Sequence, residues 1–140
     1  MSHTTREAAE NYLSRGWAII PVPFGKKAPT LKGWPDLWLT KDDLSRHFNG
    51  LPVNIGVLLG DPSGGLIDVD LDSPEALILA PRFLPPTECR FGRASTPESH
   101  WLYLVAPIPR TNQHRDLDGS VLLEVRSTGC QTLFPPSVHP

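Results

Sequence analysis

An alternation of apolar and acidic residues over residues 65–72, Gly-Leu-Ile-Asp-Val-Asp-Leu-Asp, is the strongest structural constraint in this sequence. Successive side chains of a β-strand point to opposite faces of the sheet. One face of this strand is therefore fully apolar and carries Ile67, Val69 and Leu71. The opposite face is acidic and carries Asp68, Asp70 and Asp72. The segment predicts a strand with a core on one side and a cluster of carboxylates on the other.

The three aspartates favour a bound cation. Aspartate is a poor strand former, and like charges on one strand face repel each other. Alternate residues on one face lie about 6.5 Å apart, so the carboxylates of Asp68 and Asp70 can converge on one or two magnesium ions. Asp72 adjoins Ser73 at an expected helix start and can instead be structural. A solvated acidic strand face is the alternative interpretation at this point.

Capping signals predict three helices. They begin after the capping residues Thr4, Thr40 and Ser73. Gly16 is expected to end the first helix, since glycine is the usual residue just past a helix end. Pro74 suits the first position of the third helix, and Pro81 is expected to stop that helix because proline breaks a helix interior.

Apolar runs bounded by turn residues predict about six strands. They cover residues 17–22, 54–59, 65–71, 100–105, 121–126 and 130–134. The short turn at residues 61–64 suggests that the second and third of these strands form a hairpin. Residues 81–98, rich in proline, are expected to be irregular. Because strands and helices do not alternate regularly, the order favours an α+β fold with a mostly antiparallel sheet over a doubly wound one.

Composition limits the class of protein. The chain has 140 residues, which is enough for one domain with its own core. Its 13 basic and 15 acidic residues give a net charge of −2, so any nucleic acid must be held through a local patch or with help from elsewhere. Cys89 and Cys130 form no CxxC pair and lack the spacing of a zinc site, so each is expected to be a buried or idle thiol. The polar N-terminus and the lack of an apolar run of about 20 residues predict a cytoplasmic protein without a membrane segment.

Two later segments supply further candidate site residues. In the expected strand 121–126, Glu124 and Arg126 face away from the apolar side, and Glu124 is a candidate third carboxylate. Ser99 and His100 lie at the start of another strand, where a hydroxyl and an imidazole can bind phosphate oxygens. The structural alternatives are an exposed glutamate paired with a neighbour and a histidine that only packs.

Together these segments resemble the archaeo-eukaryotic primase superfamily, in particular its bifunctional DNA primase/polymerase N-terminal domain. The shared order is Asp-x-Asp on a strand at 68–70, Ser-His opening a strand at 99–100, and an acidic residue on a later strand at 124. Four other stretches are also similar: Ser-Arg-Gly-Trp-Ala-Ile-Ile-Pro at 14–21, Gly-Lys-Lys-Ala-Pro at 25–29 with Gly-Trp at 33–34, Asn-Ile-Gly-Val at 54–57, and Pro-Pro-Ser-Val-His at 135–139. The resemblance covers essentially the whole chain.

The resemblance implies a primase-type core whose catalytic half is an RRM-like, mostly antiparallel sheet flanked by helices. It implies that Asp68, Asp70 and Glu124 are catalytic carboxylates that hold two Mg²⁺ or Mn²⁺ ions. Ser99 and His100 would bind the triphosphate of the incoming nucleotide. The implied reaction is attack of a 3′-hydroxyl on the α-phosphorus, with pyrophosphate leaving. The implied partners are nucleoside triphosphates, a single-stranded DNA template with its primer, and a helicase domain or subunit, in the replication of a phage or other mobile element.

Basic and aromatic residues add candidate contacts. Arg126, on the face of Glu124, is a candidate for binding phosphates or template. Lys27 and Lys32, in the loop at residues 23–33, are candidates for the same role, with a solvated loop charge as the alternative. Trp34 and Trp38 can stack on a base, although large apolar side chains more often pack.

Two other functions remain open at the level of sequence. A catalytically weak nucleotide-binding or replication-assembly module would suit the mild charge, but the intact site residues argue against it. A metal-dependent phosphodiesterase or nicking initiator would need clustered histidines, and the five histidines are scattered singly. Residues 1–140 are expected to form one prim-pol catalytic domain. Because the family pattern continues a little beyond residues 137–139, that domain is expected to be truncated at its C-terminus or excerpted from a longer protein.

Overall fold

The structure is a computed structural model that describes residues 4–140, and these contain three α-helices and eight strands. The α-helices are α1 (Thr5–Ser14), α2 (Leu44–His47) and α3 (Pro74–Phe83). Short 3-10 turns occupy Trp34–Asp36, Lys41–Asp43 and Asp61–Ser63. The strands are β1 (Ile19–Pro23), β2 (Val53–Leu58), β3 (Leu66–Leu71), β4 (Arg90–Arg93), β5 (Thr96–Leu104), β6 (Asn112–Arg115), β7 (Val121–Arg126) and β8 (Gln131–Phe134).

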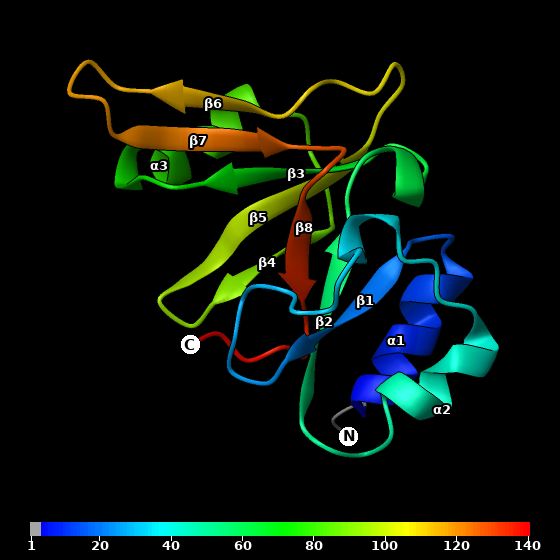
Figure 1. Cartoon of the computed structure of the whole chain (residues 1–140). Coiled ribbons are helices and arrows are strands. Elements are labelled where there is room, and N and C mark those ends of the chain that lie inside the picture. The colour runs from blue at the N-terminus through cyan, green and yellow to red at the C-terminus, as the bar shows by residue number, and fades with distance from the viewer. Residues whose placement is uncertain (1–3) are drawn as a thin grey trace.

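The strands form two antiparallel sheets, which confirms the predicted α+β class. The small sheet has the order β1-β2-β8, and the large sheet has the order β4-β5-β3-β7-β6. After β7 the chain leaves the large sheet, and β8 runs down to join the small one (Figure 1). β3 lies at the centre of the large sheet, so the acidic strand is flanked on both sides.

The predicted helix starts are confirmed. Thr4 and Glu7 form a reciprocal capping box at α1, and Ser73 accepts a hydrogen bond from Ala76 N at the start of α3. Thr40 also caps, but the segment that follows it is a 3-10 turn that leads into the one-turn helix α2. The prediction that Pro81 stops α3 is wrong. Pro81 lies in the exposed last turn, where the missing N–H removes a single backbone bond, and the helix closes with Leu84 N on the Ala80 carbonyl.

The prediction that residues 54–59 and 65–71 form a hairpin is wrong. In the structure these segments are β2 and β3, which lie in different sheets. Both edges of β2 are occupied by β1 and β8, and both edges of β3 by β5 and β7. Only an isolated bridge between Gly60 and Leu66 joins the two segments. The turn at Asp61–Ser63 therefore carries the chain from one sheet to the other, which local turn signals could not distinguish from a hairpin.

The expectation of an irregular segment at residues 81–98 is also wrong in its second half. β4 and the start of β5 form a hairpin there, and β4 pairs with β5 from Arg90 to Arg93. β6 was not expected at all. Its four residues are polar and exposed, so they carry no apolar alternation, and the strand exists because it pairs with β7 at the sheet edge.

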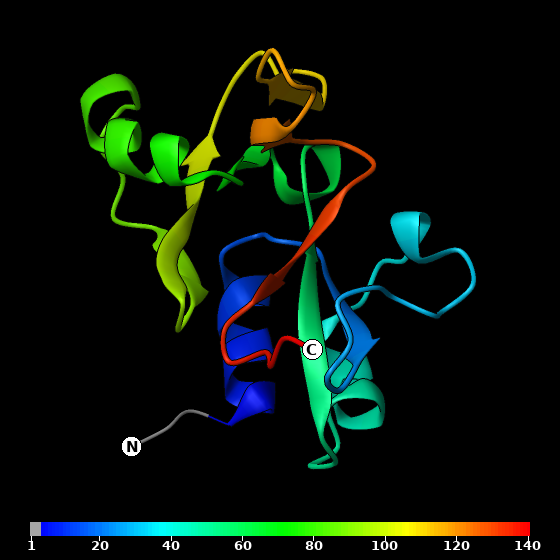
Figure 2. The same cartoon turned by 90° about the vertical axis from the view of Figure 1, so that its left-hand side faces the viewer.

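The apolar and acidic faces of β3 meet different surroundings. Val69 and Leu71 are buried against Ala76 and Ala80 of α3 and against Trp101. Figure 2 shows α3 on one side of β5 and β8 on the other. The acidic face of β3 is therefore turned toward β8 and the small sheet. A second core packs α1 and α2 on β2 and β8 and extends to Leu66 of β3 and Leu102 of β5 in the large sheet.

Gly60, at the crossing between the sheets, is a position that only glycine fits. Its φ is +75°, and a Cβ there would lie 2.3 Å from the backbone nitrogen of Thr128. We expect Gly60→Ala to lower the free energy of unfolding by about 2–4 kcal/mol, from backbone strain and the clash together. Chemical denaturation measures this. Gly50→Ala is the matched control, because Gly50 also has positive φ (+94°) but has open space around it. An equal loss in both variants would show that the contact with Thr128 contributes nothing.

Candidate functional site

The register of the large sheet brings five of the predicted site residues onto one face. Asp70 is the cross-strand partner of both His100 on β5 and Glu124 on β7, and Asp68 is the partner of Arg126. Directly opposite residues in antiparallel strands project from the same face. The acidic face of β3 is thus bordered by an imidazole on one side and by a carboxylate and a guanidinium on the other.

Asp68 is the most enclosed of these side chains. It is 0% exposed, and its Oδ2 accepts a hydrogen bond from Thr132 Oγ1 at 2.7 Å and lies 2.8 Å from His100 Nδ1. A carboxylate only accepts, so Nδ1 of His100 carries the proton and Nε2 is the nitrogen left for other partners. The second oxygen, Asp68 Oδ1, is buried and has no hydrogen-bond partner. A buried carboxylate oxygen without a partner is costly, which marks this atom as a ligand position.

The electrostatics of the face also favour a cation. Burial, together with the charges of Asp68 and Asp72, raises the pKa of Asp70 to about 6 against the opposing effect of His100 and Arg126. The pKa of Asp72 is raised by burial and by Glu124. Burial lowers the pKa of His100, but the hydrogen bond and charge of Asp68 outweigh it and leave that pKa raised. Burial therefore makes the ionised carboxylates of Asp70 and Asp72 costly, and a cation bound beside them would offset that cost.

The carboxylate of Glu124 does not join those of Asp68 and Asp70. Its Oε2 lies 3.5 Å from Gln113 Nε2 on β6, and its charge acts on Asp72 rather than on Asp70. Within residues 4–140, no three His, Cys, Asp or Glu side chains are placed to hold one metal ion. The structure thus brings Asp68, Asp70 and His100 together and leaves Glu124 at the edge of the group.

A cleft of ≈ 770 Å³ opens between the two sheets next to this face. Four of the candidate nucleotide-binding residues line it: Lys27, Ser99, His100 and Arg126. Lys32 is not among its lining residues. Trp34 lines the cleft and also packs on the small sheet, whereas Trp38 lies at a second pocket and is 67% exposed. Arg126 is held by a 2.8 Å hydrogen bond from Nη2 to the Gln131 carbonyl.

Three further residues at the site were not predicted. Thr132 holds Asp68, while Arg93 and His139 line the cleft. A threonine in an apolar strand carries no local signal of a long-range hydrogen bond. Arg93 lay in a segment expected to be irregular. His139 stood in the Pro-Pro-Ser-Val-His stretch that supported the resemblance, and that stretch was the signal that could have indicated it.

The fold and the site together are an antiparallel sheet whose central strand carries paired aspartates beside a cleft. The family model "Bifunctional DNA primase/polymerase, N-terminal" (Prim-Pol) matches residues 9–140. The chain belongs to this family, which confirms the resemblance seen in the sequence. Membership implies binding of nucleotides and DNA. No curated protein matched the chain. Among the helices of residues 4–140, none has the length and apolar character needed to cross a membrane.

Proposed function

We propose that this chain performs metal-dependent nucleotidyl transfer, adding a nucleotide from a (d)NTP to the 3′-hydroxyl of a primer on a single-stranded DNA template. One observation carries the proposal: Asp68 Oδ1 is buried and unpartnered on the same strand face as Asp70, whose pKa is raised to about 6. Family membership supports the same reaction class. We place the reaction in the cytoplasmic replication of a phage or other mobile element, with a helicase as partner.

The residues present fit Mg²⁺ or Mn²⁺. Both ions prefer oxygen ligands, and magnesium is usually held by one or two carboxylates, with waters and substrate phosphates completing its shell. Asp68 and Asp70 supply such a pair. The register of Glu124 opposite Asp70 supports its role as the third carboxylate of a two-metal site. When bound, the ions would offset the negative charge of the reacting phosphates and favour ionisation of the 3′-hydroxyl.

The other site residues would bind and orient the nucleotide. His100 is fixed through Nδ1 by Asp68, which leaves Nε2 to meet a phosphate oxygen. Ser99, Arg126 and Lys27 line the same cleft and supply one hydroxyl and two cations. Lys32 lies outside that lining, and we assign it to the template backbone. Reaction geometry held in this way lowers the entropic part of the barrier.

A primer-extension assay tests the proposal. The chain is incubated with a 5′-labelled primer on a single-stranded template, with Mn²⁺ or Mg²⁺ and dNTPs or NTPs. We expect primers that lengthen only when metal and nucleotide are both present. Nucleotide binding without extension would favour the catalytically weak binding module. Cleavage of DNA in metal without nucleotides would favour a phosphodiesterase.

Thr132 is expected to set the affinity of the site for metal. Thr132→Val keeps the shape of the side chain but removes the hydroxyl that donates to Asp68 Oδ2. We expect Mn²⁺ affinity to fall by about 10- to 100-fold, the usual cost of losing a group that orients a metal ligand. Isothermal titration calorimetry measures this. Thr132→Ser should restore the affinity, and Thr30→Val, in an exposed loop, should leave it unchanged. Unchanged affinity in Thr132→Val would contradict the assigned role.

A further inference from the structure

The segment that follows β8 returns to the cleft and is fixed there by a buried asparagine. Asn54 of β2 is 0% exposed. Its Nδ2 donates to the Lys26 carbonyl at 2.9 Å and to the Val138 carbonyl at 2.8 Å, and its Oδ1 accepts from Val138 N at 2.9 Å. These three bonds hold the backbone of the residues directly before Lys27 and His139.

Other bonds hold the same two backbones. Ser137 Oγ accepts a hydrogen bond from Ile55 N at 2.8 Å and lies 3.2 Å from the Ile55 carbonyl. Gln131 Nε2 donates to the Lys27 carbonyl at 2.9 Å. Figures 1 and 2 both place the end of the chain next to the loop that follows β1. The loop and the tail are therefore tied to β2 and β8, which fixes where their side chains begin.

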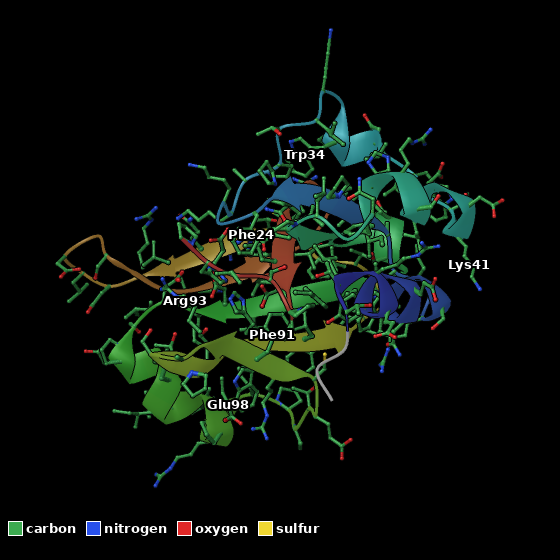
Figure 3. The ribbon with its side chains drawn as sticks, turned by 90° about the horizontal axis from the view of Figure 1, so that it is seen from below. Phe24, Trp34, Lys41, Phe91, Arg93 and Glu98 are labelled. Carbon is green, nitrogen blue, oxygen red and sulfur yellow. The ribbon has the colours of Figure 1, made fainter. Side chains whose placement is uncertain are left out.

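The side chains that project from these two held backbones enter the cleft beside an arginine. Lys27 and His139 line the cleft, and so does Arg93 of β4, which is labelled in Figure 3. Burial and the charges of Arg93, His100 and Lys27 lower the pKa of His139, and no acidic group acts on it to oppose them. A neutral imidazole still donates one N–H. Lys27, Arg93 and His139 thus give the cleft lining two cations and an N–H donor, which suit an anion.

His100 connects this set to the carboxylates. Its Nδ1 bonds to Asp68, and its charge is among those that act on His139. Asp70, His100, His139, Lys27 and Arg93 all line this one cleft, so an extended anion bound in it can lie beside the carboxylate and contact the basic side chains at once. A polyphosphate chain has that extended form and that charge.

We propose that His139, with Lys27 and Arg93, binds the β- and γ-phosphates of the incoming nucleotide, and that Asn54 and Ser137 are positioning residues for this arm of the site. The proposal rests on the proposed function for the placement of the α-phosphate at the carboxylates. It adds a binding role for the tail at residues 135–140 and for the β4 strand.

Nucleotide affinity without turnover tests the binding role. Calorimetry in Ca²⁺, with the full chain, measures the affinities of wild type and of His139→Ala for dATP and for dAMP. His114→Ala, on the exposed strand β6, is the matched control. We expect His139→Ala to weaken dATP about 10-fold or more, as for loss of a hydrogen bond to a charged group, and to leave dAMP unchanged. His114→Ala should match wild type.

Equal dATP affinity in wild type and His139→Ala would overturn the proposal, and so would an equal loss for dAMP. Wild type that binds no dATP would overturn both this proposal and the proposed function. Wild type that binds dATP through His139 but extends no primer would overturn the proposed function alone.

A double-mutant cycle tests the positioning role. Ser137→Ala releases one tether at lower risk to folding than a change at Asn54. We expect it to raise KM for dATP with kcat little changed, and Ser137→Thr to restore KM. The variant Ser137→Ala/His139→Ala should lose no more dATP affinity than His139→Ala, because the two residues act through one contact. Fully additive losses would show that Ser137 acts elsewhere and would contradict the positioning role.

Discussion

Replacing Asp68 by Asn is expected to lower the rate of primer extension by about 1,000-fold or more. The amide keeps the shape of the side chain and can accept the hydrogen bonds of Thr132 and His100, but it removes a negative charge that would hold the metal. Stabilisation of charge by a bound metal is worth several kcal/mol, and each 1.36 kcal/mol corresponds to about tenfold in rate. Single-turnover extension under saturating nucleotide measures the change.

The loss should be one of chemistry and not of folding. We expect the midpoint of thermal unfolding of Asp68→Asn to stay within about 4 °C of wild type, which corresponds to roughly 1 kcal/mol or less. Asp42→Asn, at an exposed aspartate of the 3-10 turn Lys41–Asp43, is the control and should keep full activity. Extension by Asp68→Asn at the wild-type rate would remove Asp68 from the catalytic site.

Replacing Phe134 by Ala is expected to lower the free energy of unfolding by about 3–5 kcal/mol, the usual cost of deleting a buried aromatic side chain. Phe134 is 1% exposed at the end of β8. Its ring makes edge contacts with Tyr12, Trp17 and Phe91 at centroid distances of 5.3, 5.6 and 4.8 Å. It therefore joins α1 and the small sheet to β4 of the large sheet. Urea denaturation measures the change.

The same variant should also disturb the site. Phe91, labelled in Figure 3, stacks on His100 at 5.2 Å, so the cavity left at Phe134 removes support from behind the imidazole. Phe83→Ala is the control, because Phe83 is 76% exposed on α3 and should cost little. A loss of stability in Phe134→Ala no larger than in Phe83→Ala would contradict the view that Phe134 joins the two sheets.

Local patterns in the sequence predicted the parts of the site that depend on a single strand. The alternation in residues 65–72 separated Val69 from Asp68 correctly, because side-chain parity is a property of the strand itself. The pairing of strands is not local. β2 and β3 adjoin in the chain yet lie in different sheets, since each has both edges taken by strands from elsewhere.

The contacts that complete the site span the chain. Thr132 bonds to Asp68 across 64 residues, and Asn54 bonds to Val138 across 84. Nothing in the neighbourhood of either residue signals such a bond. The family resemblance supplied Glu124 and His100 as partners of the aspartates. It did not supply Thr132. The hydroxyl of Thr132 donates to Asp68 Oδ2, and Oδ1 is left as the carboxylate oxygen without a partner.

The position of metal and nucleotide in a crystal shows whether Asp68 and Asp70 form the metal site. Crystals of the chain with Mn²⁺ and a non-hydrolysable dNTP would be measured at the manganese absorption edge, where anomalous scattering locates the ion. We expect Mn²⁺ about 2 Å from Asp68 Oδ1 and from a carboxylate oxygen of Asp70, with the triphosphate beside His100. Manganese and triphosphate bound away from Asp68 and Asp70 would show that these carboxylates do not form the catalytic metal site.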